Sequence, residues 1–330
     1  MDRPTVLVTA AALAPEAIAM LEDGGCAVAF AGAYPDEAAL RAAIAAHRPA
    51  ALLHRQGVVS AAIMDAAAPA LRVVARHGAG VDGIDLEAAA ARGLTVTRAA
   101  GANAAPVAEH AVAMMLALLK DLPAATAAMR DGRWEKTTRI TRDVAGTRLG
   151  IVGYGAIGSR VARMGDALGM EVAALDPHLP PGALPGPGAR VADLGALLAR
   201  SDVLSLHGPL DAGTRGLIGA AELARMPRGA ILIHTARGGM VDEAALLDAL
   251  DSGQLAGAGL DVFATEPLAA DSPLRTHPRV LATPHLAAST PRGALGMSTG
   301  AAESILAVLA GRMPALPGAL VVPGTLRAAA

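Results

Sequence analysis

The sequence has little of three things: cysteine, aromatic side chains and an excess of charge of one sign. Cys26 is the only cysteine, which excludes an intrachain disulfide and a metal site made of cysteines, and which favours a reducing compartment. Aromatic residues make up 2% of the chain, so any core must consist of aliphatic side chains. The formal charge of −2 over 330 residues gives no electrostatic basis for binding nucleic acid or an anionic membrane.

Long uninterrupted apolar runs are also missing. The longest one near an expected helix, residues 111–119, is bounded by His110 and Lys120 and is far shorter than the roughly 20 residues of a membrane-spanning helix. Residues 1–10 have no basic stretch ahead of an apolar one, so we expect a first strand there and no signal peptide. We therefore predict a cytoplasmic protein with neither nucleic-acid nor membrane partners.

Hydrophobic residues account for 53% of the chain, and their arrangement indicates an α/β protein. Short β-branched runs alternate with Ala- and Leu-rich stretches of helical length, which is typical of parallel sheets with connecting helices. The first series of expected strands covers residues 5–9, 27–31, 50–53, 72–76 and 95–97, with helices near 15–21, 35–46, 61–67 and 86–92. We place Pro15 and Pro35 in the first turns of their helices, where the missing N–H of proline costs little.

A second series of expected strands covers residues 148–152, 171–175, 203–206, 230–234, 258–260 and 280–282. The segment 177–188 is rich in proline and glycine and should be a loop. A helical stretch at 106–119 separates the two series, and a last long helix is expected near 291–309. The tail should fold back on the first series, so we predict a domain made of residues 1–99 and 290–330 with a second domain, 100–289, inserted in it.

A glycine motif marks the start of the second series. Gly153, Gly155 and Gly158 form a GxGxxG that directly follows the strand 148–152 and precedes a helix, and Asp176 ends the next strand. In a dinucleotide site the first glycine allows a tight turn, the second lets backbone approach a pyrophosphate, and the third permits close packing of helix and strand. A carboxylate at Asp176 accepts hydrogen bonds from a ribose and repels a 2′-phosphate, so the motif predicts NAD as the cofactor.

Three side chains capable of acid–base or anion chemistry follow later strands of the same series: Arg237, Glu266 and His285. The carboxyl ends of parallel strands are where ligands bind in such sheets. Reduction of a 2-keto acid needs a cation that holds the carboxylate, an acid that protonates the developing alkoxide, and a carboxylate that orients that acid. Each residue alone is more easily explained as structural, but the three together with the glycine motif indicate a hydride-transferring enzyme.

These residues and several longer motifs resemble the D-isomer-specific 2-hydroxyacid dehydrogenase family, which includes phosphoglycerate dehydrogenase and hydroxypyruvate reductase. The resemblance runs from about residue 70 to the last helix. The motifs that carry it are 76–82 (RHGAGVD), 107–110 (VAEH), the glycine motif, 206–210 (LHGPL), and the segments around the three catalytic candidates.

The resemblance implies a Rossmann nucleotide-binding domain inserted into a flavodoxin-like substrate domain, two doubly wound sheets that flank a cleft. It implies that Arg237 binds substrate, that His285 is the acid or base and that Glu266 is its partner. The cofactor contacts that it implies are Gly153, Gly155, Ala156, Ile157, Gly158, Asp176, His207, Gly208, Pro209, Thr214, Thr235, Ala236, Arg237, Asp261 and His285. The substrate contacts that it implies are Arg55, Ala79, Gly80, Val81, Arg237 and His285.

The family also implies a homodimer formed through the nucleotide domain and the arm at 120–145, which contains Trp134. The predicted activity is hydride transfer between NAD(H) and C2 of a small D-2-hydroxy acid such as a phosphoglycerate, hydroxypyruvate or sulfolactate type of substrate. An NAD(H)-sensing binding protein of the corepressor type is the alternative on the same fold. Formate dehydrogenase is less favoured because Glu266 stands where that enzyme has Gln, and no cluster with metal-ligand spacing is present.

Overall fold

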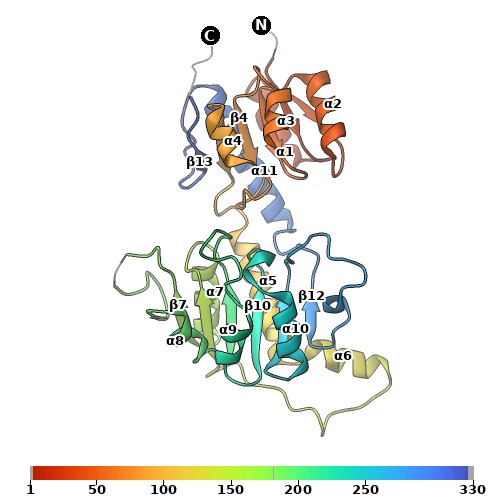
Figure 1. Cartoon of the computed structure of the whole chain (residues 1–330), viewed down its shortest axis with the longest axis vertical. Coiled ribbons are helices and arrows are strands. Elements are labelled where there is room, and N and C mark those ends of the chain that lie inside the picture. The colour runs from red at the N-terminus through yellow and green to blue at the C-terminus, as the bar shows by residue number, and fades with distance from the viewer. Residues whose placement is uncertain (1–2, 181, 326–330) are drawn as a thin grey trace. The chain divides into compact units, whose positions relative to one another are not determined.

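The computed structural model describes residues 3–180 and 182–325 and divides into two compact units (Figure 1). The first unit consists of residues 1–103 and 290–330, and the second of residues 104–289. Both are α/β units with largely parallel sheets, which confirms the expected fold class. Met1, Asp2 and residues 326–330 of the expected first domain, and Pro181 of the expected loop, lie outside the described residues.

The sheet of the first unit has six strands among the described residues, in the order β13-β5-β4-β3-β1-β2. Their bounds are β1 Thr5–Val8, β2 Ala27–Phe30, β3 Ala51–His54, β4 Val73–Arg76, β5 Thr95–Arg98 and β13 Leu320–Val322. The first five strands pair in parallel, and β13 pairs antiparallel with β5. The order β2-β1-β3-β4-β5 is that of flavodoxin-like sheets, in which ligands bind beside the β1 and β3 ends.

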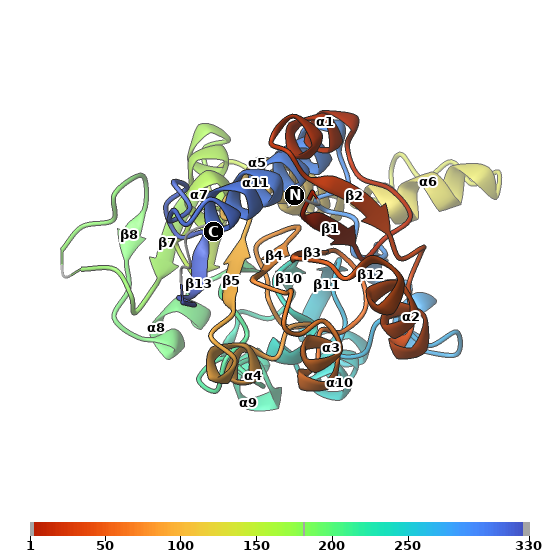
Figure 2. The same ribbon diagram turned by 90° about the horizontal axis from the view of Figure 1, so that it is seen from above.

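Helices cover both faces of this sheet: α1 Pro15–Asp23, α2 Glu37–His47, α3 Ala61–Ala66, α4 Leu86–Ala91 and α11 Pro291–Leu309. Alternate residues of the strands face opposite sides. Val6 and Val8 belong to a core with α1 and α11, whereas Leu7 belongs to one with α2, α3 and α4. Figure 2 shows these two groups of helices on either side of β1 and β4. Since α11 comes after the whole second unit in sequence, the chain returns to complete the first core.

Three local expectations were wrong. Pro35 is not in the first turn of α2, because the Asp36 carboxylate accepts a hydrogen bond from the Ala39 N–H at 2.8 Å and makes Asp36 the N-cap. The short strands β8 (Ala189–Arg190) and β13 were not expected, because two or three residues give too weak an alternation to read. The strand expected at 258–260 extends over Leu255–Leu260.

The sheet of the second unit has seven strands within the described ranges, in the order β12-β11-β10-β9-β6-β7-β8. The remaining bounds are β6 Arg148–Val152, β7 Glu171–Leu175, β9 Val203–Leu206, β10 Ala230–His234, β11 Leu255–Leu260 and β12 Val280–Ala282. All pairs are parallel. The order reverses between β6 and β9, and this reversal is where dinucleotides bind in Rossmann folds.

Six helices of the second unit are described: α5 Ala104–Leu119, α6 Leu122–Arg130, α7 Gly158–Ala167, α8 Leu194–Leu198, α9 Ala220–Arg225 and α10 Glu243–Asp251. Short 3₁₀ turns lie at Gly238–Met240 (η1) and Pro273–Arg275 (η2). Ile231 and Ile233 of β10 face the core that includes α5 and α7, and Ala230 and Leu232 face the core with α9 and α10. The sheet is therefore buried on both faces, as its continuous apolar strands require.

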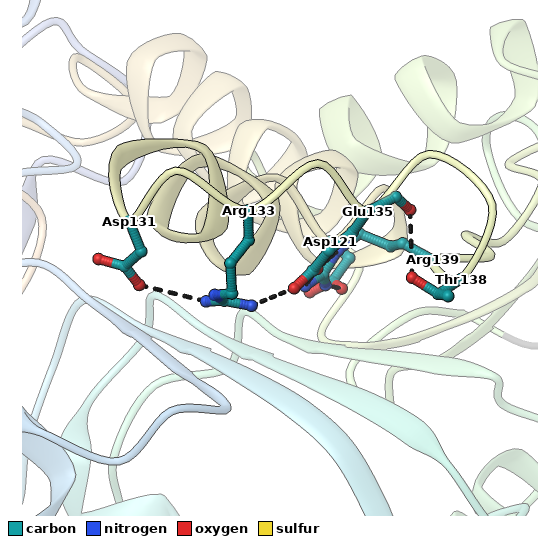
Figure 3. A network of polar contacts seen from close by, with 6 residues as sticks. All are labelled: Asp121, Asp131, Arg133, Glu135, Thr138 and Arg139. Atoms are coloured by element: carbon teal, nitrogen blue, oxygen red, sulfur yellow. Dashed lines mark hydrogen bonds and ion pairs between the residues drawn. The ribbon is translucent and has the colours of Figure 1, made fainter.

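One helix of this unit extends away from the sheet. Both views show α6 (yellow) projecting outward, followed by a long irregular segment (Figures 1 and 2). A network of ion pairs ties this segment together: Arg133 contacts Asp131 and Glu135, and Arg139 contacts Glu135 and Asp121 (Figure 3). We call α6 and residues 131–143 the arm.

No single described helix has the length and apolar character of a membrane span. Helices α5 and α6 pass such a test only when taken together, and they are bent by 60° relative to each other.

Candidate active site

The glycine motif forms the turn between β6 and α7. Gly153 has φ +87°, and a Cβ added there would lie 2.8 Å from the backbone nitrogen of Gly208 in the loop after β9. A Cβ on Gly158 would lie 1.9 Å from the Gly153 carbonyl oxygen. Both positions therefore need glycine for internal reasons, a left-handed turn and a close packing of backbone on backbone.

Gly155 differs from these two glycines. Its φ is not positive, and no described heavy atom of the protein would come within 4 Å of a Cβ placed there. Neither backbone conformation nor packing within the protein explains the glycine at this position. What remains is the approach of something external to the N-terminus of α7, where the first N–H groups of a helix have no intrahelical acceptor.

The Asp176 carboxylate is held by backbone groups on both of its oxygens. Oδ2 accepts a hydrogen bond from the Tyr154 N–H at 2.8 Å, and Oδ1 accepts one from the His178 N–H at 2.9 Å. The Asp176 carboxylate, directly after β7, is thus fixed beside the glycine turn that follows β6. Each oxygen keeps a further lone pair, so the group is oriented and able to accept from ribose hydroxyls.

Tyr154, which the sequence did not single out, joins the glycine motif to the Pro- and Gly-rich loop. Its ring is 3% exposed, and its hydroxyl donates to the Pro187 carbonyl at 2.8 Å. Burial raises the pKa of Tyr154, so the hydroxyl stays a donor. A tyrosine inside the glycine motif of a chain with only two tyrosines was the signal that pointed to this role.

Two histidines lie at the carboxyl ends of the neighbouring strands β9 and β10. His207 comes after β9, with Nε2 2.8 Å from the Ser205 hydroxyl, and His234 ends β10, with Nε2 3.0 Å from the Arg237 carbonyl. Burial, and the neighbouring His234, lower the pKa of His207 to about 3. Burial is also the main cause that lowers the pKa of His234 to about 4. Both rings are therefore neutral near pH 7.

Polar atoms at this edge lack partners among the described residues. They are Nδ1 of His207, Nδ1 of His234 and Oγ1 of Thr235, all buried. Buried polar atoms are nearly always hydrogen-bonded, so such a group at one sheet edge indicates a ligand or ordered water. Thr214, by contrast, donates its hydroxyl to the Pro209 carbonyl at 2.6 Å within its own loop.

Arg237 lies at the start of η1, directly after β10. Its loop is tightly packed, because a Cβ on Gly238 would lie 1.9 Å from the carbonyl carbon and oxygen of Phe263. The guanidinium Nη1 donates to the Ala236 carbonyl at 2.6 Å. Its positive charge also acts on Glu266, so the two predicted catalytic residues lie close enough to interact.

His285 and Glu266 form a direct pair. Nδ1 of His285 lies 2.6 Å from Oε2 of Glu266, whose Oε1 accepts a hydrogen bond from the Phe263 N–H at 3.0 Å. Burial opposes ionisation of Glu266, but the bonds from His285 and Phe263 and the charges of His285 and Arg237 outweigh it and hold the pKa of Glu266 below its usual range. The carboxylate occupies Nδ1, which leaves Nε2 of the half-exposed imidazole to face a substrate.

Asp261, at the end of β11, is 0% exposed. Its Oδ1 accepts from the Leu286 N–H at 2.8 Å, and its Oδ2 accepts from the Ala287 N–H at 2.9 Å. Asp261, which the resemblance implied as a cofactor contact, therefore holds the backbone that follows His285. The structure thus brings together Arg237, Asp261, Glu266 and His285 in loops that leave neighbouring strands of one sheet.

The substrate-binding residues expected in the first unit also follow its strands. Arg55 comes after β3; its backbone N–H donates to the Thr9 hydroxyl at 3.0 Å, and its Nη1 donates to the Ala12 carbonyl at 3.0 Å. This places Arg55 at the β1–β3 ligand position of the flavodoxin-like order. Ala79, Gly80 and Val81 lie in the loop after β4, and no hydrogen bond within the described residues uses their N–H groups.

Arg76 organises these loops and was not among the expected site residues. Its Nη1 donates to the Arg55 carbonyl at 2.8 Å and its Nε donates to the Gly80 carbonyl at 2.9 Å. One guanidinium thus fixes the backbone of both candidate substrate loops. It is the first residue of the 76–82 motif, and its place at a strand end was the available signal.

Comparisons with known proteins agree on one family. Residues 112–287, more than half of the chain, match the model described as D-isomer specific 2-hydroxyacid dehydrogenase, NAD binding domain. The D-3-phosphoglycerate dehydrogenase of Mycobacterium tuberculosis is 42% identical over 324 residues, which cover 98% of this chain and 60% of that protein. The corresponding protein of Bacillus subtilis is 39% identical over 72% of this chain and 45% of its own length. The chain thus spans less than two thirds of these relatives.

Solved structures of proteins with a similar chain length also match this chain. The TT0316 protein of Thermus thermophilus superposes with a TM-score of 0.86 at 36% identity, covering 96% of this chain and 100% of that one. An NADPH-dependent glyoxylate/hydroxypyruvate reductase of Sinorhizobium meliloti, in complex with NADP and malonate, superposes with a TM-score of 0.84 at 29% identity over both whole chains.

Proposed function

This chain belongs to the D-isomer specific 2-hydroxyacid dehydrogenase family, and we propose that it transfers a hydride between NAD(H) and C2 of a small D-2-hydroxy acid or the matching 2-keto acid. One observation carries the proposal: a histidine and a carboxylate 2.6 Å apart, His285 and Glu266, stand beside Arg237 on the sheet that also bears the glycine motif. The second unit thus contains the proposed acid, its carboxylate partner, the cation for the substrate and the turn for the dinucleotide.

The residues at the edge of the second sheet fit an NAD cofactor. Gly155 leaves space at the N-terminus of α7 that no described protein atom uses, and Asp176 is oriented as a ribose acceptor. The partnerless Oγ1 of Thr235 and Nδ1 of His207 supply further polar contacts. We assign NAD over NADP because a fixed carboxylate at Asp176 repels a 2′-phosphate. When bound, the reduced cofactor supplies the hydride.

The protein side chains supply binding and the proton. In the direction of reduction, Arg237 holds the keto-acid carboxylate and polarises the carbonyl, and its planar fork suits two parallel hydrogen bonds. His285 delivers a proton from Nε2 to the carbonyl oxygen as C2 accepts the hydride. Glu266 keeps the other nitrogen, Nδ1, protonated and stabilises the charged ring. In oxidation the neutral imidazole takes the hydroxyl proton back.

We assign the first unit to substrate binding. Arg55 supplies a cation, and Ala79, Gly80 and Val81 supply N–H groups without described acceptors, which together suit an acidic substrate. Of the substrate types expected from the sequence, phosphoglycerate and hydroxypyruvate also occur in the names of relatives, and the sulfolactate type stays a prediction. A cytoplasmic location stays a prediction.

A steady-state panel tests this function. Purified protein is assayed with NADH and NADPH against hydroxypyruvate, glyoxylate, 3-phosphohydroxypyruvate and 3-sulfopyruvate. We expect turnover of at least one substrate with NADH. His285→Gln should reduce kcat in both directions by about 10²–10⁴-fold with unchanged NADH affinity, whereas His47→Gln, on an exposed end of α2, should have no effect.

The same panel addresses the alternative function. NADH binding without turnover of any keto acid would overturn the enzyme and favour an NAD(H)-sensing binding protein. In a separate assay with NAD, oxidation of formate without oxidation of any 2-hydroxy acid would favour a formate dehydrogenase.

We also propose that the arm joins two copies of the chain. Four large apolar side chains of the arm are exposed: Leu122, Met129, Trp134 and Ile140, at 53, 56, 76 and 92%. The ion pairs of Figure 3 link residues 121–139 of this segment to one another, which favours a defined arrangement of the apolar side chains around them. A second copy that covers Trp134 and Ile140 removes this surface from water.

Light scattering tests the dimer. The parent should have the mass of two chains, and a Trp134→Ala, Ile140→Ser variant should shift toward one. Val58→Ser, which removes an exposed apolar side chain (64% exposed) outside the arm, should not change the mass. A monomeric parent would overturn the assembly.

A further inference from the structure

The backbone at His285 has an unusual conformation. Its φ is +50°, in the left-handed region that residues with a side chain rarely adopt. Such a conformation persists only where the surrounding structure holds it, and such sites cluster where function needs a fixed geometry. The turn at His285 must therefore be stabilised by contacts outside the residue itself.

Asp261 supplies those contacts. A left-handed residue turns the N–H groups that follow it to one side, which creates a small anion-binding concavity. The N–H groups of Leu286 and Ala287 point at the two oxygens of the buried Asp261 carboxylate, at 2.8 and 2.9 Å. A buried carboxylate that accepts such charge-assisted hydrogen bonds is a strong fixed point for the turn.

Two further residues complete the surroundings of that carboxylate. The Thr283 hydroxyl donates to Oδ1 of Asp261 at 2.5 Å, and Nε2 of His110 lies 3.1 Å from the same hydroxyl. The hydroxyl has one hydrogen and donates it in the bond to Asp261, so in the contact with His110 it acts as the acceptor of a hydrogen bond. His110 Nε2 therefore carries hydrogen, and a directed chain runs from His110 through Thr283 to Asp261.

We propose that His110 is a positioning residue of the active site: with Thr283 it completes the hydrogen bonds of Asp261, which holds the turn that presents His285 to Glu266. We call His110, Thr283 and Asp261 the anchor. Helix α5, which carries His110, packs on β10 and β11, so the anchor ties the turn to the core of the sheet. The kinetic part of this inference rests on the proposed dehydrogenase function.

The role that we propose for the anchor is to orient the His285 imidazole, and not to bind the cofactor or the substrate. The 2.6 Å contact between His285 and Glu266 requires the imidazole to leave the backbone in one direction. Glu266 is fixed separately through the Phe263 N–H. If the 285 turn relaxes, the ring moves away from a partner that does not follow it, and small displacements of reacting groups are costly to turnover.

Paired substitutions test the anchor. Thr283→Val removes the hydroxyl at nearly constant volume, and Thr283→Ser retains it. His110→Leu removes the donor, and His110→Gln retains an N–H at a similar reach. Thr276→Val, at an exposed position after η2, is the matched control for a threonine-to-valine change in the same unit.

Two readouts are needed, one of them independent of catalysis. Amide hydrogen exchange reports directly on the Leu286 and Ala287 N–H groups. In Thr283→Val the bond from the Thr283 hydroxyl to the buried Asp261 carboxylate is lost, so we expect about ten-fold faster exchange at these two amides. In His110→Leu we expect a smaller increase. Thr283→Ser, His110→Gln and Thr276→Val should exchange like the parent.

The kinetic readout separates positioning from general damage. In Thr283→Val, kcat for keto-acid reduction should fall by between about ten- and a hundred-fold, with less than a two-fold change in the Kd for NADH and an unchanged Tm. Thr283→Ser and His110→Gln should restore kcat.

Each outcome decides between explanations. Unchanged exchange at Leu286 and Ala287 in both Thr283→Val and His110→Leu overturns the anchor, whatever the activity. Faster exchange in a protein that reduces no keto acid supports the anchor and overturns the dehydrogenase. A loss of kcat that the Ser and Gln variants do not restore, or that comes with a lower Tm, shows a role in stability alone.

Discussion

Each unit has one sheet edge that carries candidate site residues, and the loops at the two edges are fixed by side chains of opposite charge. In the second unit, carboxylates fix the loops by accepting from backbone N–H groups: Asp176 from Tyr154 and His178, and Asp261 from Leu286 and Ala287. In the first unit, a cation fixes the loops by donating to backbone carbonyls, as Arg76 does to Arg55 and Gly80. The loops named here are therefore fixed through N–H groups in the second unit and through carbonyl groups in the first.

The polar groups that remain also differ between the two edges. Carbonyls are consumed in the first unit, and the N–H groups of residues 79–81 remain without described acceptors, so this edge suits an anion. In the second unit the carboxylates that organise the loops also give the site negative groups, which suit ribose hydroxyls and a protonated imidazole. The side chains that fix the loops therefore also contribute to the charge that each edge presents to a ligand.

The units share one feature: each buries two histidines at this edge. Burial, with the neighbouring arginine charges, lowers the pKa of His54 and of His77 to about 4, and the second unit has His207 and His234 at about 3 and 4. In an unfolded chain these rings titrate near 6.5. The unfolded state therefore binds more protons below that pH.

The largest expected effect follows from this shared feature. Because the folded pKa values lie below the unfolded ones, stability is fully present above pH 6.5 and is lost as pH falls toward 4. Each buried histidine should remove up to about 1.4 kcal/mol of unfolding free energy per pH unit in this range. Urea unfolding at pH 7, 6 and 5 measures the slope. A His54→Gln variant should show a smaller slope than the parent, and equal slopes would contradict the neutral burial of that ring.

The second effect isolates the cation of the second unit. Arg237→Lys keeps the charge but loses the planar fork, and should cost about 2–4 kcal/mol in kcat/KM for the best keto acid. NADH affinity should stay the same, and Arg200→Lys, on an exposed position, should behave like the parent. An Arg237→Lys enzyme with parental kcat/KM would show that the arginine is structural.

The third effect concerns the charge of Glu266, which its depressed pKa keeps ionised at neutral pH. Glu266→Gln keeps the shape but removes the field that favours a charged imidazole. The alkaline loss of reduction and the onset of oxidation should both move to lower pH. The measurement is kcat/KM against pH in both directions, and superimposable profiles of parent and variant would refute the dyad.

The fourth effect changes the ribose side of the same edge. The parent should prefer NAD over NADP because the fixed Asp176 carboxylate repels a 2′-phosphate. Asp176→Ser with Pro177→Arg should shift the ratio of the two kcat/KM values by at least about ten-fold, or about 1.4 kcal/mol. Equal efficiency of the parent with both cofactors would remove Asp176 from the cofactor site.

The smallest effect tests the first unit. Arg76→Lys cannot reach both carbonyls with a planar fork, so the 79–81 loop should loosen at a cost of about 1 kcal/mol. KM for the keto acid should rise several-fold, whereas kcat and NADH affinity should change little. Arg41→Lys, on the exposed face of α2, is the control, and a fall in kcat at constant KM would contradict substrate binding by this loop.

The sequence was sufficient for the longer strands of both sheets and for the spacing of the candidate site residues along the chain. Strand β6, the glycine turn and Asp176 could be located because each has a mechanical requirement visible in residue type. Helix α11 was predicted with the observed bounds, since Pro291 and a sustained apolar period mark its ends. The Gly153 and Gly158 roles follow from backbone contacts that no larger residue allows.

The supporting contacts were not predictable. Arg76, Tyr154, Thr283 and His110 act through hydrogen bonds to residues distant in sequence, such as the 173 positions between His110 and Thr283. A single sequence gives residue type and spacing along the chain but not which side chains meet across a sheet. The left-handed φ of His285 was hidden for the same reason, because glycine, the usual marker of such a turn, is absent there.

The return of α11 to the first unit has a consequence for how the chain acquires its structure. Ala301, Ala302 and Ile305 cover one face of the first sheet, and Arg72 bonds to Leu309, 237 residues away. During synthesis α1 can cover its part of that face early, but the part that α11 covers stays exposed until the contiguous second unit has been made, since loops of this length close late. The first unit can therefore complete its core only after the whole second unit has been synthesised, although most of its own strands come first in the sequence.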